Sequence, residues 1–401
     1  MAGLTRIEQA CVERASAEPM LAQVKAWAAI NSGTRNLAGL ASLSAKLADA
    51  FSVLPGELKL LDPAPVEGIA ADGTPFSIEH GRNLHLTVRP EAPLQYLFTG
   101  HMDTVFGADH SFQSLHWVEE GVLGGPGVAD MKGGIAVMLA ALKAIEASGD
   151  TSFGYDVVIN SDEEVGSPGS AALIARAARG KRAALTYEPA ALPDGTLAGA
   201  RPGSGNFSFV VTGKSAHAGR NPEDGRNALL AAADLALRLA RGKGQGLGIN
   251  PAKIDGGGPN NVVPDSAVLR VNLRPTTIDD QARAQALIDG AVAQVAAEHE
   301  VGIHAHGGFA RPPKPMTNEA GALFGLVRQA GADLGQAIDW QATGGVCDGN
   351  NIAACGVPVV DTMGVRGGKI HSMEEFLITE SLAERAALSA LTILRLAGGT
   401  A

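Results

Sequence analysis

The residues best suited to chemistry are His101 and Asp103, which directly follow the short apolar run 96–100. Such a run is typical of a strand buried on both faces. If the backbone stays extended beyond it, residues two apart project to the same side. A carboxylate beside an imidazole can accept one ring N–H and leave the other nitrogen free for a metal ion. At this point the alternative is an ordinary loop histidine with an acidic neighbour.

Further acidic residues follow other predicted strands or a tight turn. They are Asp130 after the glycine-rich turn 121–127, Glu163 and Glu164 after the apolar run 156–160, and Glu188 after the run 183–187. Open α/β sheets bind their ligands at the carboxyl ends of their strands, so these side chains are expected to meet. The glycine-rich turn lacks the spacing of a phosphate-binding loop. Its glycines instead allow the backbone to bring Asp130 close to a ligand or metal.

The apolar pattern places helices and buried strands in an order typical of an α/β protein. Helices are predicted over 5–30, 37–51, 135–147, 319–334 and 379–396, and buried strands over 96–100, 156–160, 183–187 and 357–361. Helix 135–147 is apolar on nearly every side and is therefore expected to be buried. The segment 58–88 mixes turns and short strands that the pattern does not place.

The pattern changes near residue 201, where a second unit begins. Strands are predicted over 206–211, 248–254, 267–274 and 301–306, with helices over 227–241 and 279–300. The order β-α-β-β-α-β is that of a ferredoxin-like domain inserted into the first domain. The predicted division is 1–200 for the first part of a catalytic domain, 201–312 for the inserted domain, and 313–401 for the second part.

Composition excludes several classes of protein. The 401 residues suffice for two or three domains, and 32 Lys plus Arg against 42 Asp plus Glu give a net charge of −10. That balance disfavours a nucleic-acid or anionic membrane surface. No apolar span reaches 18 residues, and charges stand where a signal peptide needs an apolar core, so a cytoplasmic location is predicted. Three cysteines without C-x-x-C spacing indicate neither a disulfide framework nor a cysteine zinc site.

Six separated motifs give the chain a resemblance to a known family. They are Gly-His101-Met-Asp103-Thr, Gly-Val-Ala-Asp130-Met-Lys-Gly-Gly, Asp-Glu163-Glu164-Val-Gly, Ser-Ala-His217-Ala-Gly, Asn261-Val-Val-Pro264 followed by Arg274, and His371-Ser. Over nearly its full length the chain resembles the di-zinc aminoacylase and glutamate carboxypeptidase family, which includes succinyl-diaminopimelate desuccinylase. Bacterial glutamate carboxypeptidases are the most similar members, because they share the Glu-Pro pair found at Glu188–Pro189.

The resemblance implies a fold and a metal centre. The fold is an α/β zinc-peptidase catalytic domain with a mixed, mostly parallel sheet, plus an inserted ferredoxin-like α+β dimerisation (lid) domain. Two zinc ions would be bridged by Asp130, with His101 and Glu188 completing one ion and Glu164 and His371 the other. Imidazole and carboxylate ligands suit Zn²⁺, and three protein ligands per ion leave positions for water and substrate. Mn²⁺ or Co²⁺ could bind similarly.

The same resemblance implies the catalytic and substrate-binding residues. Glu163 would be the general base, taking a proton from metal-activated water and passing it to the leaving amine, and Asp103 would orient His101. His217 would polarise the scissile carbonyl; the alternative is an ordinary turn histidine. The expected binders of the substrate carboxylate are Asn261, Arg274, Arg201 and Arg311, a role that suits a bidentate guanidinium. For Arg274 the alternative is an ion pair on an edge strand.

Two departures from the family pattern concern specificity. Glutamate carboxypeptidases carry a basic residue after Glu-Pro, whereas residues 190–197 here contain no Lys or Arg. Glutamate specificity is therefore not implied. Cys347 stands where relatives often have Ser or Thr, and it is either a metal-proximal thiol or a small packing residue. The resemblance also predicts a cis bond between Asp130 and Met131.

The function expected from this pattern is hydrolysis of an amide next to a free carboxylate, in an N-acyl amino acid or short peptide. The alternatives are a deacetylase or N-carbamoyl amidohydrolase of the same fold, or a metal-binding partner subunit without catalysis. The substrate would be a small molecule with a free carboxylate. The inserted domain is expected to form a symmetric homodimer in which His217 and Asn261 act in the partner's site.

Overall fold

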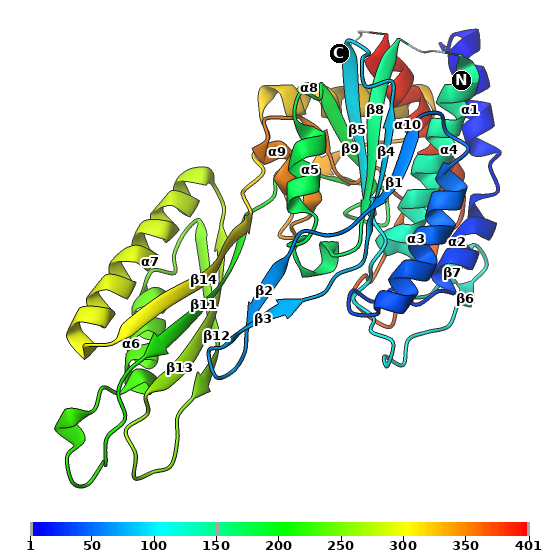
Figure 1. Ribbon diagram of the computed structural model, residues 1–401. Helices are drawn as coiled ribbons and strands as arrows, with labels where there is room; N and C mark the ends of the chain where they lie inside the picture. The colour runs from blue at the N-terminus through cyan, green and yellow to red at the C-terminus, as the bar shows by residue number, and fades with distance from the viewer. Residues whose placement is uncertain (1–2, 150–151, 399–401) are drawn as a thin grey trace.

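The computed structural model describes residues 3–149 and 152–398 and shows a larger and a smaller α/β unit (Figure 1). The larger unit is built on a six-stranded sheet with the strand order β1-β4-β8-β5-β9-β16. Its strands are β1 (Glu57–Leu61), β4 (Asn83–Val88), β8 (Phe153–Asn160), β5 (Leu94–His101), β9 (Ala183–Thr186) and β16 (Val359–Val360). β8, β5, β9 and β16 run parallel, and β4 is antiparallel to both β8 and β1. The expected mixed, mostly parallel sheet is confirmed.

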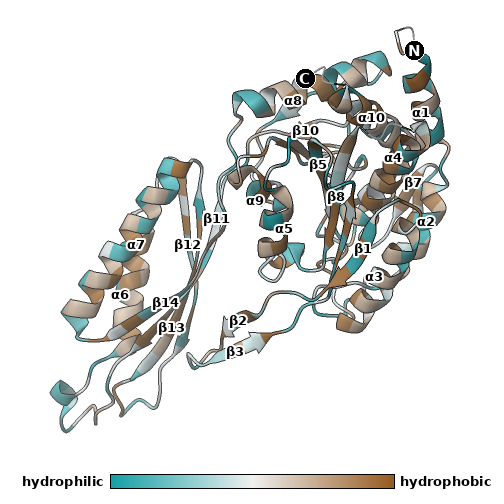
Figure 2. Cartoon of the chain, turned by 45° about the horizontal axis from the view of Figure 1, so that its top comes forward, coloured by the Kyte–Doolittle hydropathy of each residue, from teal (hydrophilic) through white to brown (hydrophobic). Residues whose placement is uncertain are grey.

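Helices cover both faces of this sheet (Figure 1). One face packs on α1 (Arg6–Ser16), α2 (Met20–Ala28), α3 (Leu37–Phe51), α4 (Gly134–Ser148), α8 (Asn318–Asp333) and α10 (Glu380–Ala397), and the other on α5 (Ala171–Ala178) and α9 (Asp348–Ala354). Alternation along the strands divides the core, since Phe98 and Val157 face the first group while Leu97 and Val158 face the second. Figure 2 shows hydrophobic residues gathered along β5 and β8.

Short strands complete the larger unit. β6 (His116–Glu119), β7 (Val122–Gly124), β17 (Gly367–Gly368) and β18 (Phe376–Ile378) form a small sheet, β10 (Leu197–Ala198) pairs with β15 (Trp340–Gln341), and β2 (Val66–Ile69) and β3 (Pro75–Ile78) form a hairpin. The segment that sequence could not place thus contains β1 to β4. Among the described residues, no helix combines the length and apolar character needed to cross a membrane.

The smaller unit is an antiparallel four-stranded sheet with two helices on one face (Figure 1). Its elements in chain order are β11 (Ser204–Thr212), α6 (Ala228–Arg241), β12 (Leu247–Gly256), β13 (Ser266–Pro275), α7 (Ile278–His299) and β14 (Gly302–Arg311). This β-α-β-β-α-β order confirms the ferredoxin-like expectation. Both helices begin at side-chain caps, Asn227 for α6 and Thr277 for α7.

The β2–β3 hairpin extends from the larger unit to the smaller unit (Figure 1). It reaches the face of the smaller sheet opposite α6 and α7, where Arg270 Nη2 donates to the main-chain oxygen of Ile69 at 2.9 Å. His306 Nε2 lies 3.0 Å from the main-chain oxygen of Glu67. The hairpin therefore covers part of the face of the smaller sheet that the helices leave open.

The single helix expected over 5–30 was wrong, because the structure divides it into α1 and α2 around Pro19. Proline has no N–H and disfavours helical geometry in the residue before it. α1 begins with a capping box between Thr5 and Glu8 and ends before this proline. The division lets both short helices pack on the same face of the large sheet.

Candidate active site

Three adjacent parallel strands deliver ligand-type side chains to one edge of the large sheet. β5 ends at His101, β8 is followed by Glu163 and Glu164 in a 3₁₀ turn, and β9 is followed by Glu188. Because parallel strands end at the same edge, these side chains converge as expected. The local sequence turns from apolar to acidic at that edge, so each strand supplies both a buried core segment and a polar end.

His101 is buried, with 1% of its surface exposed, and its two ring nitrogens face different groups. Nδ1 lies 3.0 Å from the main-chain oxygen of Asp103 and 3.4 Å from its carboxylate. Nε2 lies 3.1 Å from Asp130 Oδ1 and 3.6 Å from Glu188 Oε2. The nitrogen directed at the acidic cluster is thus the one available to a metal ion.

The Asp103 carboxylate also holds the turn that carries the two glutamates. It accepts hydrogen bonds from the main-chain N–H groups of Glu163 and Glu164, at 3.1 and 3.2 Å, and from the Thr34 hydroxyl at 2.8 Å. One fully buried carboxylate therefore links the end of β5 to the turn after β8. Sequence reasoning gave it a role toward His101 alone.

Asp130 lies at the centre of the cluster. Its Oδ1 faces His101, and its Oδ2 lies 3.3 Å from Nε2 of His371, which in turn lies 3.0 Å from Glu164 Oε2. The Asp130–Met131 peptide bond is cis, which confirms the prediction. One carboxylate thus presents an oxygen to each of two histidines that are 270 residues apart in sequence, from 101 to 371.

The donor set fits divalent metal ions. Two overlapping groups have ligand atoms within 4.8 Å of one another, namely His101, Asp130 and Glu164, and His101, Glu163 and Glu188. Imidazole nitrogens and carboxylate oxygens are ligands that Zn²⁺ accepts. So many carboxylates in one buried place repel one another unless cations balance them, as metal ions do. The division of ligands between two ions remains a prediction.

The pKa values of the cluster show this imbalance of charge. Burial raises the pKa of Glu164 to about 7, with a further increase from neighbouring Asp130. Burial also raises the pKa of Glu163 well above its usual range, although the charge of Arg311 opposes the shift. Hydrogen bonds from His371 to Asp130 and Glu164 raise the pKa of the imidazole to about 11. Burial is thus the main cause for the two glutamates, and contact with carboxylates is the main cause for His371.

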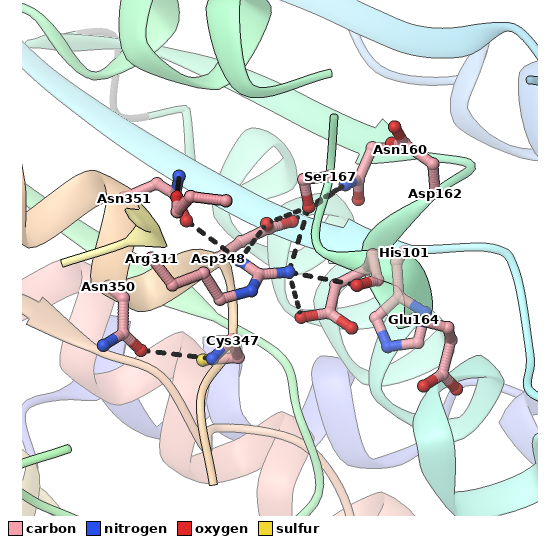
Figure 3. Close-up of polar contacts among 12 residues, drawn as sticks. His101, Asn160, Asp162, Glu164, Ser167, Arg311, Cys347, Asp348, Asn350 and Asn351 are labelled. Carbon is pink, nitrogen blue, oxygen red and sulfur yellow. Dashed lines mark hydrogen bonds and ion pairs between the residues drawn. The ribbon is translucent and has the colours of Figure 1, made fainter. Parts of the chain in front are cut away.

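Arg311 and Arg201 both lie at the site, but protein groups already bind their guanidinium groups. Arg311 donates to Glu163 Oε1 at 2.6 Å. It also donates to Asp348 Oδ1 at 2.8 Å (Figure 3). Arg201 makes a bidentate pair with Asp361, at 2.8 and 3.1 Å. The acidic partners were missed because they are distant in sequence; the only signal is that Asp361 ends the predicted strand 357–361. Substrate binding by either arginine remains a prediction.

The residues expected in the inserted unit are divided between two places. Arg274 is exposed and lines a cavity of about 350 Å³ together with Glu163, Glu164 and His371. His217 and Asn261 are also exposed, and the main-chain N–H of Ala218 donates to the main-chain oxygen of Asn261 at 2.9 Å. Their loops lie at the end of the smaller unit farthest from the large sheet (Figure 1). Within one chain, the structure does not bring these two residues to the acidic cluster.

Cys347 lies beside the arginine pairs. Its Sγ is 3.5 Å from Asp361 Oδ2, and burial raises the pKa of the thiol well above its usual range. The metal-type groups found among the described residues do not include it. A protonated, buried thiol in this position agrees with the small packing residue rather than with a metal ligand.

Comparison with known proteins assigns the class. Residues 97–395 match the peptidase family M20/M25/M40, and the chain belongs to that family. It is therefore a hydrolase of a family whose members bind divalent metals. It is 30% identical to carboxypeptidase G2 of Pseudomonas sp. (strain RS-16) over 333 residues, 80% of this chain and 78% of that protein. It is 31% identical to succinyl-diaminopimelate desuccinylase of Maricaulis maris (strain MCS10) over 306 residues, 70% and 75% of the two chains.

Solved structures show the same fold. A tripeptidase from Staphylococcus aureus superposes with a TM-score of 0.70 at 24% identity, covering 97% of this chain and 99% of that one. An M20 family metallo-carboxypeptidase from Sulfolobus solfataricus gives a TM-score of 0.68 at 14% identity, with 94% and 98% coverage. The resemblance inferred from the six motifs is confirmed at the level of family and fold.

Proposed function

We propose that this chain is a dinuclear zinc hydrolase that cleaves an amide bond adjacent to a free carboxylate. The observation that carries the proposal is the position of Asp130, with one carboxylate oxygen facing His101 and the other His371. Around it, Glu188 lies on the His101 side and Glu164 on the His371 side. This arrangement supports the two ligand sets that share Asp130. Zinc bound there would polarise an amide carbonyl and lower the pKa of a water molecule.

Glu163 is the proposed general base. One of its oxygens accepts from Arg311 at 2.6 Å, while its side chain lines both cavities at the cluster. Arg311 holds the carboxylate in position, and Asp103 fixes the main chain beneath it at 3.1 Å. Glu163 would take the proton of the attacking water and deliver it to the leaving amine. Glu164 is the less suitable base because it already contacts His371.

Two cavities meet at the cluster and support the substrate class. One of about 350 Å³ contains Arg274, and within the described chain the only polar partner of its guanidinium is Asn272 Oδ1, 2.9 Å from Nε. The other, of about 300 Å³, contains Ala190, Ala191 and Arg201. Both share Glu163, Glu164 and His371. We place the substrate carboxylate near Arg274 and the scissile amide where the cavities meet.

The second cavity favours a neutral group on the other side of the amide. Its wall includes Ala190, Ala191 and Ala198, and its arginine is already paired with Asp361. A charged side chain entering there would lose water without gaining a free partner. A neutral acyl group or an uncharged N-terminal residue fits better. This agrees with the lack of a basic residue in 190–197.

A second copy would complete the site. His217 and Asn261 are exposed, and the outer face of α6 exposes Leu230 and Leu237, each 60% accessible. β12 is an edge strand of the smaller sheet. An exposed edge beside apolar side chains is suited to pairing across a two-fold axis. We propose a homodimer in which His217 and Asn261 of each chain lie at the acidic cluster of the partner and help to bind and polarise the substrate carbonyl.

A hydrolysis screen tests the proposal. Zinc-loaded protein is incubated with N-acyl amino acids and C-terminal dipeptides that vary in acyl group and side chain, each beside its carboxamide analogue. We expect cleavage of the free acids, little cleavage of the carboxamides, and preference for neutral acyl groups. A matched preparation of Glu163→Gln controls for contaminating peptidases. Equal cleavage of acids and carboxamides would contradict the role of the free carboxylate, and no cleavage of either would contradict the hydrolase.

A further inference from the structure

The loop that carries Asp130 is held by one carboxylate that lies outside the acidic cluster. Glu375 Oε2 accepts from the main-chain N–H of Gly127 at 3.1 Å. Its Oε1 accepts from those of Ala129 at 3.0 Å and Asp130 at 3.1 Å. All three donors are buried, and Glu375 itself is 1% exposed. Buried N–H groups need partners, and here a single side chain satisfies three of them.

Strand pairing brings Glu375 to this loop. It directly precedes β18, which pairs with β7 so that Phe376 lies opposite Gly124. The main-chain N–H of Gly125 also donates to the Glu375 main-chain oxygen at 3.2 Å. The loop leading into β18 carries His371 four residues earlier. One loop thus contacts Asp130 at two points. Glu375 binds the main-chain N–H of Asp130, and His371 contacts the Asp130 carboxylate.

Glu375 has no direct place in the chemistry. It lines neither cavity at the cluster and belongs to neither metal-type group among the described residues. Both of its oxygens are occupied by N–H donors. The nearby Lys132 ammonium donates to the main-chain oxygen of Ile30 at 3.1 Å. Burial and the nearby Asp130 carboxylate raise the pKa of Glu375 to about 7, and the hydrogen bonds of Glu375 reach the centre through the main chain of Asp130.

We propose that Glu375 is a positioning residue that orients Asp130 toward both metal ions. Three hydrogen bonds from neighbouring main-chain N–H groups converge on this one buried carboxyl group, so they fix the Asp130 backbone and hence the direction of its carboxylate. Because Asp130 would be the shared ligand, Glu375 sets the affinity of both ions together. Partners of metal ligands commonly act in this way. The inference rests on the proposed dinuclear centre.

The test measures Zn²⁺ affinity instead of activity. Apo protein is titrated with Zn²⁺ in competition with a chromophoric chelator, for the wild type, Glu375→Gln, Glu374→Gln and His371→Ala. In Glu375→Gln an amide NH₂ replaces one acceptor, so at least one buried N–H loses its partner. We expect both zinc equivalents to weaken by about ten- to hundredfold. Glu374 is exposed and near Lys369, so its variant is the matched control and should bind as the wild type does.

Other outcomes overturn the proposal. If Glu375→Gln lowers the melting temperature of the apo protein but keeps both zinc affinities, Glu375 is only structural. If it weakens the same single equivalent as His371→Ala, it acts through the histidine loop and not through Asp130. Fewer than two equivalents in the wild type would instead contradict the proposed dinuclear centre. Should Glu375→Gln fail to fold, Glu375→Asp decides: its shorter carboxylate should weaken both equivalents about tenfold, and wild-type affinities would refute the role.

Discussion

The larger unit and the inserted unit hold most of their chemistry-bearing residues in opposite ways, and the exception is His371 of the larger unit, whose side chain is 54% exposed. In the larger unit His101 is 1% exposed and Asp103 is fully buried, and both contact further buried residues. In the inserted unit His217, Asn261 and Arg274 are all exposed. Buried polar groups must find partners within the chain, whereas exposed groups can remain solvated until a ligand or second subunit arrives. The acidic cluster is therefore assembled by one chain, whereas the proposed dimer would let His217 and Asn261 of the inserted unit act after association.

The difference follows from topology. Parallel strands bring the residues after β5, β8 and β9 to one edge, so that His101, Glu163 and Glu188 are close as soon as the sheet forms. The inserted sheet is antiparallel, and its connecting loops emerge at both ends. Arg274 lies at the end near the large sheet, whereas the loops with His217 and Asn261 lie at the opposite end (Figure 1). One chain cannot place both ends of this sheet at one cluster without a large movement.

The largest expected effects come from two residues of the larger unit, the proposed base Glu163 and the proposed metal ligand His371, whose variants should differ in metal content. Glu163→Gln should lower turnover by at least about a hundredfold and keep the bound metal, because general acid–base catalysis contributes on that scale. The Gln carbonyl can still accept from Arg311, so the site keeps its shape. His371→Ala should lose metal, because His371 contacts both Asp130 and Glu164. Turnover and metal content are measured together, and the reverse pattern would exchange the two roles.

His217 of the inserted unit should show its effect only through a second copy. His217→Ala is expected to lower turnover at least about tenfold while the melting temperature is unchanged, since an exposed side chain contributes little to stability. The cause would be loss of a group that polarises the carbonyl in the partner's site. Turnover and thermal unfolding of the purified variant check this.

Mixed dimers separate action within a chain from action across the interface. Co-expression of Glu163→Ala and His217→Ala gives mixed dimers in which one site has both lesions and the other has neither. Because random mixing makes about half of the dimers mixed, roughly a quarter of wild-type activity should return. Mixed dimers as inactive as both parents would show that His217 does not serve the partner, and a fully active monomer would contradict the whole arrangement.

Arg274 combines features of both units, because it is an exposed residue of the inserted unit that lines the cavity at the acidic cluster. Arg274→Lys keeps the charge but loses the planar pair of donors, so KM for a free-acid substrate should rise about tenfold or more, with a smaller change in kcat. Arg241→Lys, at the exposed end of α6, is the matched control. Steady-state kinetics on an acid and its carboxamide decide, since equal changes for both substrates would exclude recognition of the carboxylate.

Sequence predicted the elements whose pattern is local. The apolar strands 96–100 and 156–160 and the buried helix 135–147 correspond to β5, β8 and α4. The β-α-β-β-α-β order of the inserted unit was also readable, because alternation and helical spacing are properties of short windows. The hairpin β2–β3 was not, because its partner surface on the smaller sheet is more than a hundred residues away: Arg270 contacts Ile69. The break at Pro19 was overlooked although proline is a local signal.

The candidate site was predictable where a motif marks it and not where pairing is distant. His101, Asp130 and Glu164 converge as the motifs imply. The pairs Arg201–Asp361 and Arg311–Asp348 were missed, since nothing in either local sequence names a partner. Arginines predicted to await a substrate carboxylate already bind protein carboxylates. Which polar residues remain available to a ligand depends on tertiary pairing, and single-sequence patterns do not contain that information.

The smallest expected effect is on the free energy of unfolding, and it appears when a buried ion pair of the larger unit is compared with an exposed one of the inserted unit. Burial alone would raise the pKa of Asp156, but hydrogen bonds from His85 and Lys181 lower it to about 2. A depressed folded-state pKa stabilises the protein above the unfolded-state pKa, near 4, and this stabilisation is lost as pH falls toward 2. Asp156→Asn should therefore lower the free energy of unfolding by about 2 kcal/mol at pH 7, and the difference from wild type should shrink between pH 4 and 2.

Asp234→Asn in α6 removes partners of Arg238 and His299 at the surface, and should lower the free energy of unfolding by less than about 1 kcal/mol. Urea unfolding followed by tryptophan fluorescence reports the larger unit, because Trp27, Trp117 and Trp340 all lie outside 204–311, and circular dichroism reports both units. Equal losses in the two variants, or a loss in Asp156→Asn that grows in acid, would contradict the larger contribution expected of the buried ion pair.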